Sequence, residues 1–281
     1  PGEQSPIVEH PDVRQMLLWQ KAWSEGCRAL LLKTGAWVDV ANGSDDEAER
    51  QRAQGLVALL TPVCKAASTD LGFQTTSLAV QTLGGYGYVR EFPVEQYLRD
   101  VRIASIYEGT NGIQAMDLAG RKLAARGGED LRTLLTMMGE LCEAHRSHPR
   151  LGHDVGLLAD AVAALGDCAT FLGKTAPQDM GLLLANASPF LELFGQVVIG
   201  WLLLEQATIA HPRLEALCQE QSVASDDDAA LGELCARNDE AKFFHGKLTV
   251  AAFYARRTLP LCRARADVLQ SGDRSVLEAA L

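Results

Sequence analysis

Apolar residues recur at helical spacing along most of the chain, and this periodicity constrains its fold more than any other feature. Val13, Met16, Trp23 and Cys27 follow the pattern, so we predict a long helix over residues 11–40. Leucine and alanine are abundant while valine and isoleucine are sparse, and strands prefer β-branched side chains. The sequence therefore predicts an all-α protein.

The first half carries further helix boundaries. Asn42 and Gly43 end the first helix, and Ser44 with Glu47 three residues later forms a capping box that opens a second helix through Leu71. A short helix then reaches Leu83 and is followed by a glycine-rich turn.

Two more helices are expected before the middle of the chain. Pro93 starts a short helix that ends near Arg102, and another helix covers residues 111–125. The residues of the latter helix predicted to face inward are Ile113, Met116, Gly120 and Leu123.

A break at Arg126, Gly127 and Gly128 separates two parts of the chain. We predict a helical domain over residues 5–126 and a second helical bundle over residues 128–281. The second part reads as an antiparallel bundle of about four helices. Its predicted helices lie near residues 131–141, 157–172, 180–210 and 231–259, punctuated by Pro177, by His211 with Pro212, and by the acidic run 226–228.

Composition narrows the possible partners. The net charge is −10 and basic runs are short, which argues against nucleic acid because phosphate neutralisation needs clustered cations. The most apolar run, residues 197–204, is far shorter than the ~20 residues that span a bilayer, so no membrane span is predicted. No secretory signal opens the chain, and we expect a cytoplasmic protein. Residues 1–4 are typical of a loop interior, so we expect the natural chain to begin upstream.

The cysteines and histidines indicate neither disulfides nor a metal site. Seven dispersed cysteines form no CxxC pair and fall in predicted helices, as expected of buried thiols in a reducing compartment. His145, His148 and His153 lie together at a polar helix end, where we expect solvated side chains rather than metal ligands.

The segment between Gly72 and Gly112 differs from its surroundings because glycines are dense there, which suits backbone lying close to another molecule. Near its end, Ile106 and Tyr107 place an apolar wall beside Glu108.

Thr110 and Asn111 follow Glu108 and are good N-caps, so the free N–H groups of the next helix lie beside this carboxylate. Such a site suits an anion or a polarised oxygen. Burial raises the pKa of a carboxyl group and the helix dipole lowers it, and the sequence leaves this balance open. Glu108 is therefore a candidate general base, with a plain helix-capping acid as the alternative.

Two composite motifs around Glu108 stand at a fixed interval. The first is QTLGGYGY from Gln81 to Tyr88, and the second is IYEGT from Ile106 to Thr110, with FPVE and LRD between them. Together with EHPDVR at residues 9–14, their order and spacing resemble the C-terminal domain of the acyl-CoA dehydrogenases over about residues 5–125.

The resemblance implies a reaction and a catalytic site. In that family FAD is reduced while an acyl-CoA thioester gains an α,β double bond. Glu108 matches the base that removes the α-proton, and its backbone N–H would bind the thioester carbonyl. Tyr107 and Gly109 are the implied substrate contacts, since Gly109 lets the backbone approach the acyl group.

The resemblance also implies a flavin site. Gln81, Gly84 and Gly85 match the element that contacts the adenine-diphosphate part of FAD, usually across a subunit boundary, with a plain tight turn as the alternative. Thr110 matches a hydroxyl near the flavin. Arg99 and Asp100 match a pair expected to fix the loop that leads to Glu108. Asn111 and Gly112 complete the predicted cofactor contacts, although relatives often carry a longer polar residue in place of Gly112.

Other parts of such an enzyme are absent from this sequence. The family places an N-terminal helical domain and a middle β-domain before this region, so we expect a fragment that binds flavin weakly or not at all alone. The second bundle resembles a bacterial subgroup that includes 3-methylmercaptopropionyl-CoA dehydrogenases.

The resemblance implies partners and leaves alternatives. It implies an acyl-CoA substrate, an electron-transfer flavoprotein as acceptor, and a homodimer or homotetramer. One alternative is an acyl-CoA oxidase, in which oxygen takes the electrons. Another is a non-catalytic binding or assembly module, against which the presence of Glu108 and the acidic charge argue. Acyl chain length and branching stay open.

Overall fold

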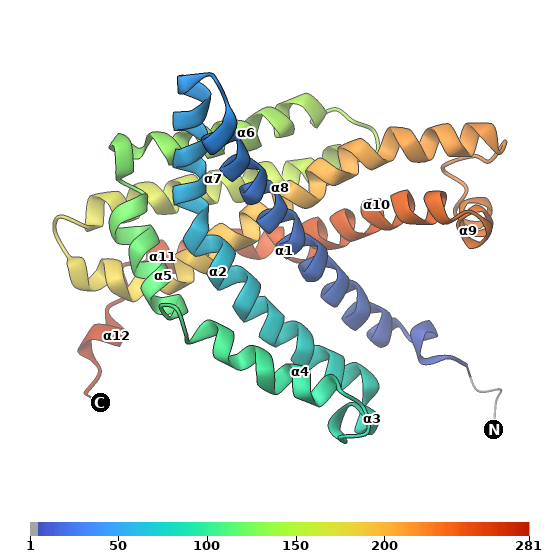
Figure 1. Ribbon diagram of the computed structural model, residues 1–281, viewed down its shortest axis with the longest axis horizontal. Coiled ribbons are helices and arrows are strands. Elements are labelled where there is room, and N and C mark those ends of the chain that lie inside the picture. The colour runs from blue at the N-terminus through green and yellow to red at the C-terminus, as the bar shows by residue number, and fades with distance from the viewer. Residues whose placement is uncertain (1–4, 281) are drawn as a thin grey trace.

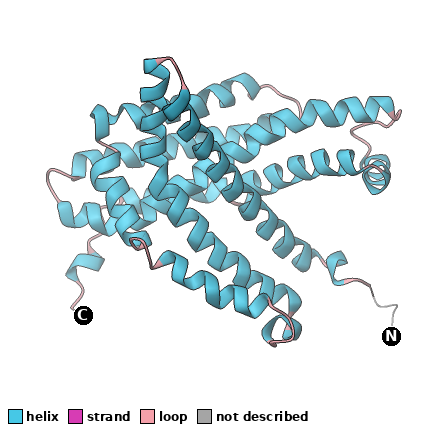
Figure 2. Ribbon diagram, in the orientation of Figure 1, coloured by secondary structure: helices cyan, strands magenta, loops and turns pink. Residues whose placement is uncertain are grey.

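The computed structural model describes residues 5–280, and every regular element in that range is helical (Figure 2). The prediction of an all-α protein is therefore confirmed. The loop predicted for residues 1–4 lies outside the described residues.

The first part of the chain forms a projecting arm and the base from which it extends (Figure 1). The arm consists of the second half of the long helix α2, of α4, which packs along it, and of α3 at the tip. The elements are η1 (Ile7–Glu9), α1 (Pro11–Gly43), α2 (Glu47–Leu83), α3 (Gly85–Tyr88), α4 (Val94–Val101), η2 (Arg102–Ser105), α5 (Asn111–Asp117), the π-helical turn η3 (Leu118–Lys122) and η4 (Ala125–Gly128).

The second part is built around one very long helix, α8, which packs against α1, α2, α5, α7, α10 and α11. The elements are α6 (Glu129–His145), α7 (Gly152–Thr175), α8 (Met180–Glu220), α9 (Asp228–Arg237), α10 (Asp239–Arg257), α11 (Leu259–Gln270) and α12 (Ser275–Glu278).

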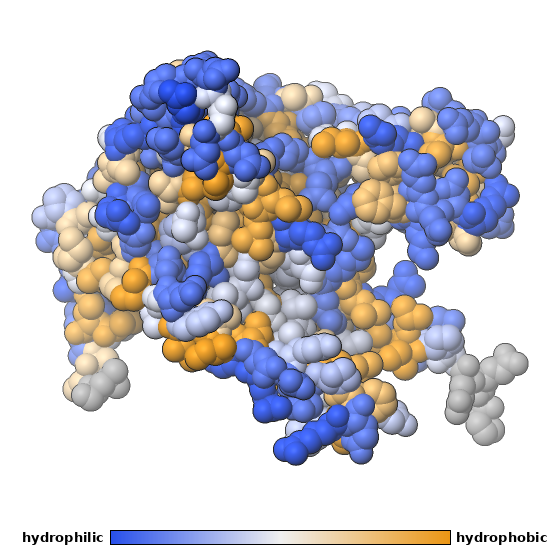
Figure 3. All heavy atoms as spheres, viewed as in Figure 1, coloured by the Kyte–Doolittle hydropathy of each residue, from blue (hydrophilic) through white to orange (hydrophobic). Residues whose placement is uncertain are grey.

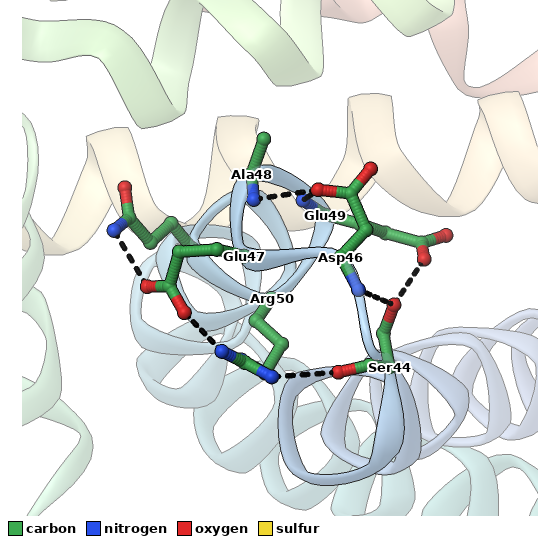
Figure 4. Close-up of polar contacts among 7 residues, drawn as sticks. Ser44, Asp46, Glu47, Ala48, Glu49 and Arg50 are labelled. Carbon is green, nitrogen blue, oxygen red and sulfur yellow. Dashed lines mark hydrogen bonds and ion pairs between the residues drawn. The ribbon is translucent and has the colours of Figure 1, made fainter.

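The start of α2 corrects one predicted cap. Asp46, and not Ser44, caps the helix: its Oδ1 accepts from the N–H groups of Ala48 at 2.8 Å and Glu49 at 3.4 Å (Figure 4). Ser44 instead accepts from the Asp46 N–H and donates to the Glu49 carboxylate. Asp46 directly precedes the first helical residue, and this N-cap position places its carboxylate within hydrogen-bond distance of these N–H groups.

Several predicted boundaries are also wrong. The second helix does not stop near residue 71 but continues to Leu83, and α8 runs through Pro212 to Glu220. A proline inside a helix removes one hydrogen bond, yet α8 is held from several sides by packing, which outweighs that loss. Residues 231–259 form two helices because Asn238 caps a new one, its Oδ1 accepting from Ala241 N–H at 2.9 Å. Helix α11 was not predicted.

The inward face of α5 differs from the prediction as well. Ile113 and Met116 are exposed, and Ala115 and Leu118 are buried instead. Gly120 is exposed and Leu123 is half-buried. Helix α5 packs against α2 and α8, so these partners, which lie far from it in the sequence, decide which of its faces is buried.

The two parts meet at a sharp turn but share one core. Arg126, Gly127 and Gly128 all have left-handed backbone, with φ of 49°, 66° and 78°. Beyond this turn, Trp23 of α1 packs edge-on against Tyr254 of α10 with ring centroids 4.8 Å apart. The division into domains 5–126 and 128–281 stays a prediction, and the hydrophobic core is continuous across it.

Three helices among the described residues, α2, α7 and α8, are long and apolar enough to cross a membrane by length and composition alone. The prediction of no membrane span rested only on the uninterrupted apolar run at residues 197–204, so it missed these helices. Each of the three helices contains scattered polar residues between its apolar ones. Of the most apolar window in α8, 78% is buried inside the protein, against 39% in α2 and 44% in α7. The absence of a membrane span stays a prediction.

The cysteines match their predicted setting in part. All seven are free; five are buried, while Cys27 and Cys235 are half-buried. Burial raises the pKa of the Cys262 thiol to about 12 and that of Cys142 to about 11. These thiols pack as small apolar side chains.

Candidate active site

Glu108 occupies an unusual backbone position between η2 and α5. Its φ is 54°, in the left-handed region that side chains avoid, and Gly109 follows with φ of 80°. For a residue other than glycine this conformation costs roughly 1–2 kcal/mol. Such strain is found most often at functional sites, where the surrounding structure holds it in place.

Helix α5 begins directly after this loop, as predicted. The Thr110 hydroxyl accepts from the Ile113 N–H at 3.3 Å and caps the helix. Gln114 closes the loop from within the helix, with its Nε2 donating to the Glu108 carbonyl oxygen at 3.5 Å. The predicted N-terminal geometry beside Glu108 is therefore present.

The residues predicted to form an apolar wall beside Glu108 do not bury this carboxylate. Ile106 and Tyr107 are half exposed, at 49% and 52%, and Glu108 is exposed too. Its carboxylate has no hydrogen-bond or ion-pair partner in residues 5–280. Apolar neighbours in sequence enclose a carboxylate only when another surface covers them, and residues 5–280 do not supply that surface.

Asn111 holds the loop against α2. Its Oδ1 accepts from Lys65 Nζ at 2.6 Å, and its Nδ2 donates to the Thr69 hydroxyl at 2.9 Å. The side-chain polar atoms of Asn111 are thus engaged within the chain, and its role in cofactor binding stays a prediction. No spacing signal in the sequence marks Lys65 or Thr69, because they precede Asn111 by more than forty residues.

The predicted flavin element lies at the tip of the arm. Gly84 ends α2 with φ of 59°, and its N–H donates to the Gln81 carbonyl at 3.1 Å. The space beside Gly84 and Gly85 is open, and Gln81 is exposed. Along the chain, α4 and η2 lie between this tip and the Glu108 loop, and Figure 1 shows α3 and α5 toward opposite ends of α4. The structure therefore does not join the two motifs into one site within the chain.

The intervening pair does not act as expected. Arg99 pairs with Glu95 at 2.9 Å along α4, and Asp100 accepts from Gln96 at 3.2 Å. Neither side chain reaches the Glu108 loop. The two residues make helical i,i+4 contacts instead, a pairing that favours the helix itself.

Two hollows flank the arm. A cavity of about 540 Å³ lies between α2 and α8, and Arg102 and Asn111 are in its lining. A second, of about 770 Å³, lies between α1 and α2 and includes Trp19 and Gln81. Neither hollow is lined by Glu108.

The histidines thought to be solvated are partly packed. The ring of His148 meets that of His211 edge-on at 4.7 Å, and its Nδ1 accepts from the N–H groups of Arg150 and Leu151. His145 is half-buried and His153 is exposed. Residues 5–280 contain no group of three or more His, Cys, Asp or Glu side chains placed to hold a metal ion.

Comparison with known proteins decides which family this architecture represents. Residues 134–280 match the family described as acetyl-CoA dehydrogenase C-terminal like, and residues 1–123 match the acyl-CoA dehydrogenase C-terminal domain. The chain belongs to the acyl-CoA dehydrogenase family. This family is one of oxidoreductases.

Curated acyl-CoA dehydrogenases resemble the chain over almost its whole length. The 3-methylmercaptopropionyl-CoA dehydrogenase of Ruegeria pomeroyi is 36% identical over 98% of this chain, and that match covers 43% of the relative. The broad-specificity linear acyl-CoA dehydrogenase FadE5 of Mycobacterium tuberculosis is 34% identical over 97% of this chain and 43% of its own. The chain thus spans less than half the length of these relatives.

Solved structures of acyl-CoA dehydrogenases share the fold. ACDH-11 of Caenorhabditis elegans, solved with C11-CoA, aligns with a TM-score of 0.63 at 16% identity, over 92% of this chain and 38% of its own. An acyl-CoA dehydrogenase of Bacillus anthracis, solved with FAD, aligns at 0.54 and 17% identity, over 96% of this chain and 47% of its own. At these identities the likeness concerns the fold alone.

Proposed function

We propose that this chain forms the C-terminal part of an FAD-dependent acyl-CoA dehydrogenase that introduces an α,β double bond into an acyl-CoA thioester. The observation that carries the proposal is the strained loop at Glu108. A carboxylate is held in left-handed backbone directly before a capped helix, in a chain of this family. Residues held in such strained backbone cluster at functional sites, which supports a role for this carboxylate.

Glu108 has the groups that the reaction needs. Its carboxylate has no partner within the described chain and is free to take the substrate α-proton. Its backbone N–H also donates to nothing in residues 5–280, so it is available to bind the thioester carbonyl as negative charge develops there. Gly109 adds no side chain beside that position, and Tyr107 would contact the acyl group.

Most of the predicted flavin-binding residues fit that cofactor. FAD, when bound, would accept the hydride from the substrate β-carbon. Gln81, Gly84 and Gly85 present exposed backbone and open space, which suits a phosphate-bearing group. Gly112 and Thr110 would lie nearest at the start of α5, with the Thr110 hydroxyl also capping that helix. Asn111 would contribute through its main chain, because its side chain is bonded to α2.

The exposed site is consistent with a larger protein. Glu108 needs a dry surrounding to act on a weakly acidic carbon, and the described residues leave it in solvent. The curated relatives are more than twice as long as this chain. We infer that the rest of such a protein covers the Glu108 loop. The tip carrying Gly84 would serve the flavin of a neighbouring protomer in a homodimer or homotetramer.

The remaining assignments follow from the same proposal. The electron acceptor would be an electron-transfer flavoprotein, and the protein would act in the bacterial cytoplasm. An acyl-CoA oxidase would instead form hydrogen peroxide under air without any added acceptor.

The decisive experiment replaces Glu108 by glutamine in a full-length protein that contains this chain. An amide cannot accept the proton, so Glu108→Gln should keep flavin bound while slowing flavin bleaching by acyl-CoA by orders of magnitude. Glu91→Gln is the matched control, since Glu91 is an exposed carboxylate on the same arm. Unchanged bleaching in Glu108→Gln would place the base elsewhere.

The isolated chain offers a separate test. We expect it to take up FAD weakly or not at all, because the described residues present no enclosed flavin site. Spectrophotometric titration of the chain with FAD measures this directly. Tight stoichiometric uptake would contradict the need for further domains in FAD binding. It would not test the role of Glu108, which the Glu108→Gln variant tests separately.

A further inference from the structure

A hollow in the second part of the molecule belongs to none of the motifs above. It lies between the start of α7 and the C-terminal half of α10, and its volume is about 410 Å³. That size is within the range of small-molecule sites. The residues that matter here, which we call the arginine pocket, are Arg150, Asp154, Leu248, Phe253, Arg256 and Arg257.

One guanidinium of the pocket is held rigidly. Asp154 is buried, and it accepts from Arg256 Nε at 2.6 Å and Nη2 at 3.1 Å. This two-point pairing fixes the plane of the Arg256 side chain. The Nη1 of Arg256 has no partner in the described chain, so one edge of a positioned guanidinium stays free for a ligand.

The other two arginines lack acidic partners. No ion pair in residues 5–280 involves Arg150 or Arg257, and Asp154, the carboxylate in the pocket lining, is already bound to Arg256. Arg150 makes one neutral contact, with its Nη1 donating to the Ser225 carbonyl oxygen at 3.4 Å. The pocket therefore carries a local excess of positive charge in a chain whose net charge is −10. Four of the seven other arginines in residues 128–281 do pair with acids, such as Arg265 with Glu192.

The surroundings favour an anion that also has an apolar part. Arg150 and Leu151 directly precede the 24-residue helix α7, so the pocket lies at the positive end of its dipole. Phe253 and Leu248 supply an apolar wall beside the arginines. A bare inorganic ion would use only the charged half of this pocket.

We propose that the arginine pocket binds a small organic phosphate. The phosphate contacts Arg150, Arg257 and the free edge of Arg256, and the apolar or aromatic part of the ligand packs on Phe253. The site shares no residue with the segment from Gln81 to Gln114, so this proposal is tested independently of the proposed dehydrogenase activity. The phosphate can belong to a soluble nucleotide-like molecule or to a lipid headgroup, and the two are separable by experiment.

Calorimetric titration of the 281-residue chain with ADP tests the soluble source. Binding is expected to weaken with salt, and Arg150→Ala and Arg257→Ala should each weaken it about tenfold, the loss of one charge-assisted contact. Arg237→Ala is the matched control, because Arg237 is exposed, has no ion pair and lies outside the pocket. Adenosine, which lacks phosphate, should not bind.

Vesicles of phosphatidylglycerol test the lipid source with the same variants. Vesicle binding that requires Arg150 and Arg257 would identify a headgroup, and ADP binding that requires them would identify a soluble ligand. The proposal is overturned if neither probe binds, or if Arg237→Ala weakens binding as much as the pocket variants do. Arg256→Ala is avoided, since it leaves the buried Asp154 carboxylate unpaired and risks unfolding the chain.

Discussion

The segment that carries the proposed chemistry and the helix that carries the core are built in opposite ways. Between residues 85 and 113 the one buried residue is Gly87. In α8, by contrast, every residue from Val197 to Leu204 is buried. The site segment instead exposes apolar side chains, among them Tyr86, Tyr97 and Ile103, and apolar surface is visible on this arm in Figure 3.

The buried helix α8 and the exposed site segment therefore contribute different properties: the first stabilises the fold, and the second carries the proposed function. Burial of apolar surface stabilises a fold in proportion to the area removed from water, so α8 and its neighbours supply most of that free energy. A contiguous exposed apolar surface marks an interaction site. Under the proposed function, other parts of the protein or a second protomer would cover this exposed surface of the arm.

The largest expected effect on folding contrasts one aromatic residue from each region. Phe194 is fully buried in α8 and packs edge-on against Phe190, so Phe194→Ala should lower the free energy of unfolding by about 3–5 kcal/mol. Tyr97 is 56% exposed on α4, and Tyr97→Ala should change the free energy of unfolding by less than about 0.5 kcal/mol. Urea denaturation of both variants measures the contrast. Similar losses in both would show that the arm belongs to the stabilising core.

A second contrast uses two glycines. A Cβ at Gly200 in α8 would stand 2.7 Å from the buried Leu259 side chain, so Gly200→Ala should destabilise the fold by roughly 1–3 kcal/mol. A Cβ at Gly85 would meet nothing within 4 Å, and Gly85→Ala should be neutral or stabilise by roughly 0.4–1 kcal/mol. The same denaturation experiment checks both. A stable Gly200→Ala would mean that Leu259 moves aside.

Periodicity and caps allowed much of this fold to be predicted. The all-α class, the long first helix and the cap by Thr110 depend on neighbouring residues, which the sequence shows directly. The continuation of α8 through Pro212 depends on partners far along the chain, and no local pattern carries it. The predictions of where α2 ends and of which face of α5 is buried failed for the same reason.

The site divides along the same line. The motifs locate Glu108, and the helix start beside it could be predicted because both lie within a few residues. The link from Asn111 to Lys65 joins two segments distant in sequence, so it could not. The exposure of Glu108 was also unpredictable, since burial depends on which surfaces are present and not on the residues beside it.

The strain at Glu108 predicts a smaller effect within the site segment itself. Glu108→Ala and Glu108→Gly both remove the carboxylate, but only glycine adopts the left-handed backbone without a steric cost. The glycine variant should therefore be more stable than the alanine variant by about 1 kcal/mol, part of the relief being offset by its greater freedom when unfolded. Equal stability would mean that the loop relaxes out of this conformation. That result would remove the structural support for a strained catalytic residue.

The last expected effect belongs to the stabilising region and appears only on acidification. Burial lowers the pKa of His211 in α8 and of His245 in α10, and Arg150 adds to both shifts. Their pKa is thus lower in the folded than in the unfolded state, so below the unfolded value of about 6.5 the unfolded chain binds more protons. Stability should be full above that pH and decline as the pH falls toward the folded values. Urea midpoints measured between neutral and mildly acidic pH should show a shallower decline in a His211→Gln, His245→Gln double variant than in His153→Gln, which changes an exposed histidine. An unchanged slope in the double variant would assign the acid sensitivity to other groups of the chain.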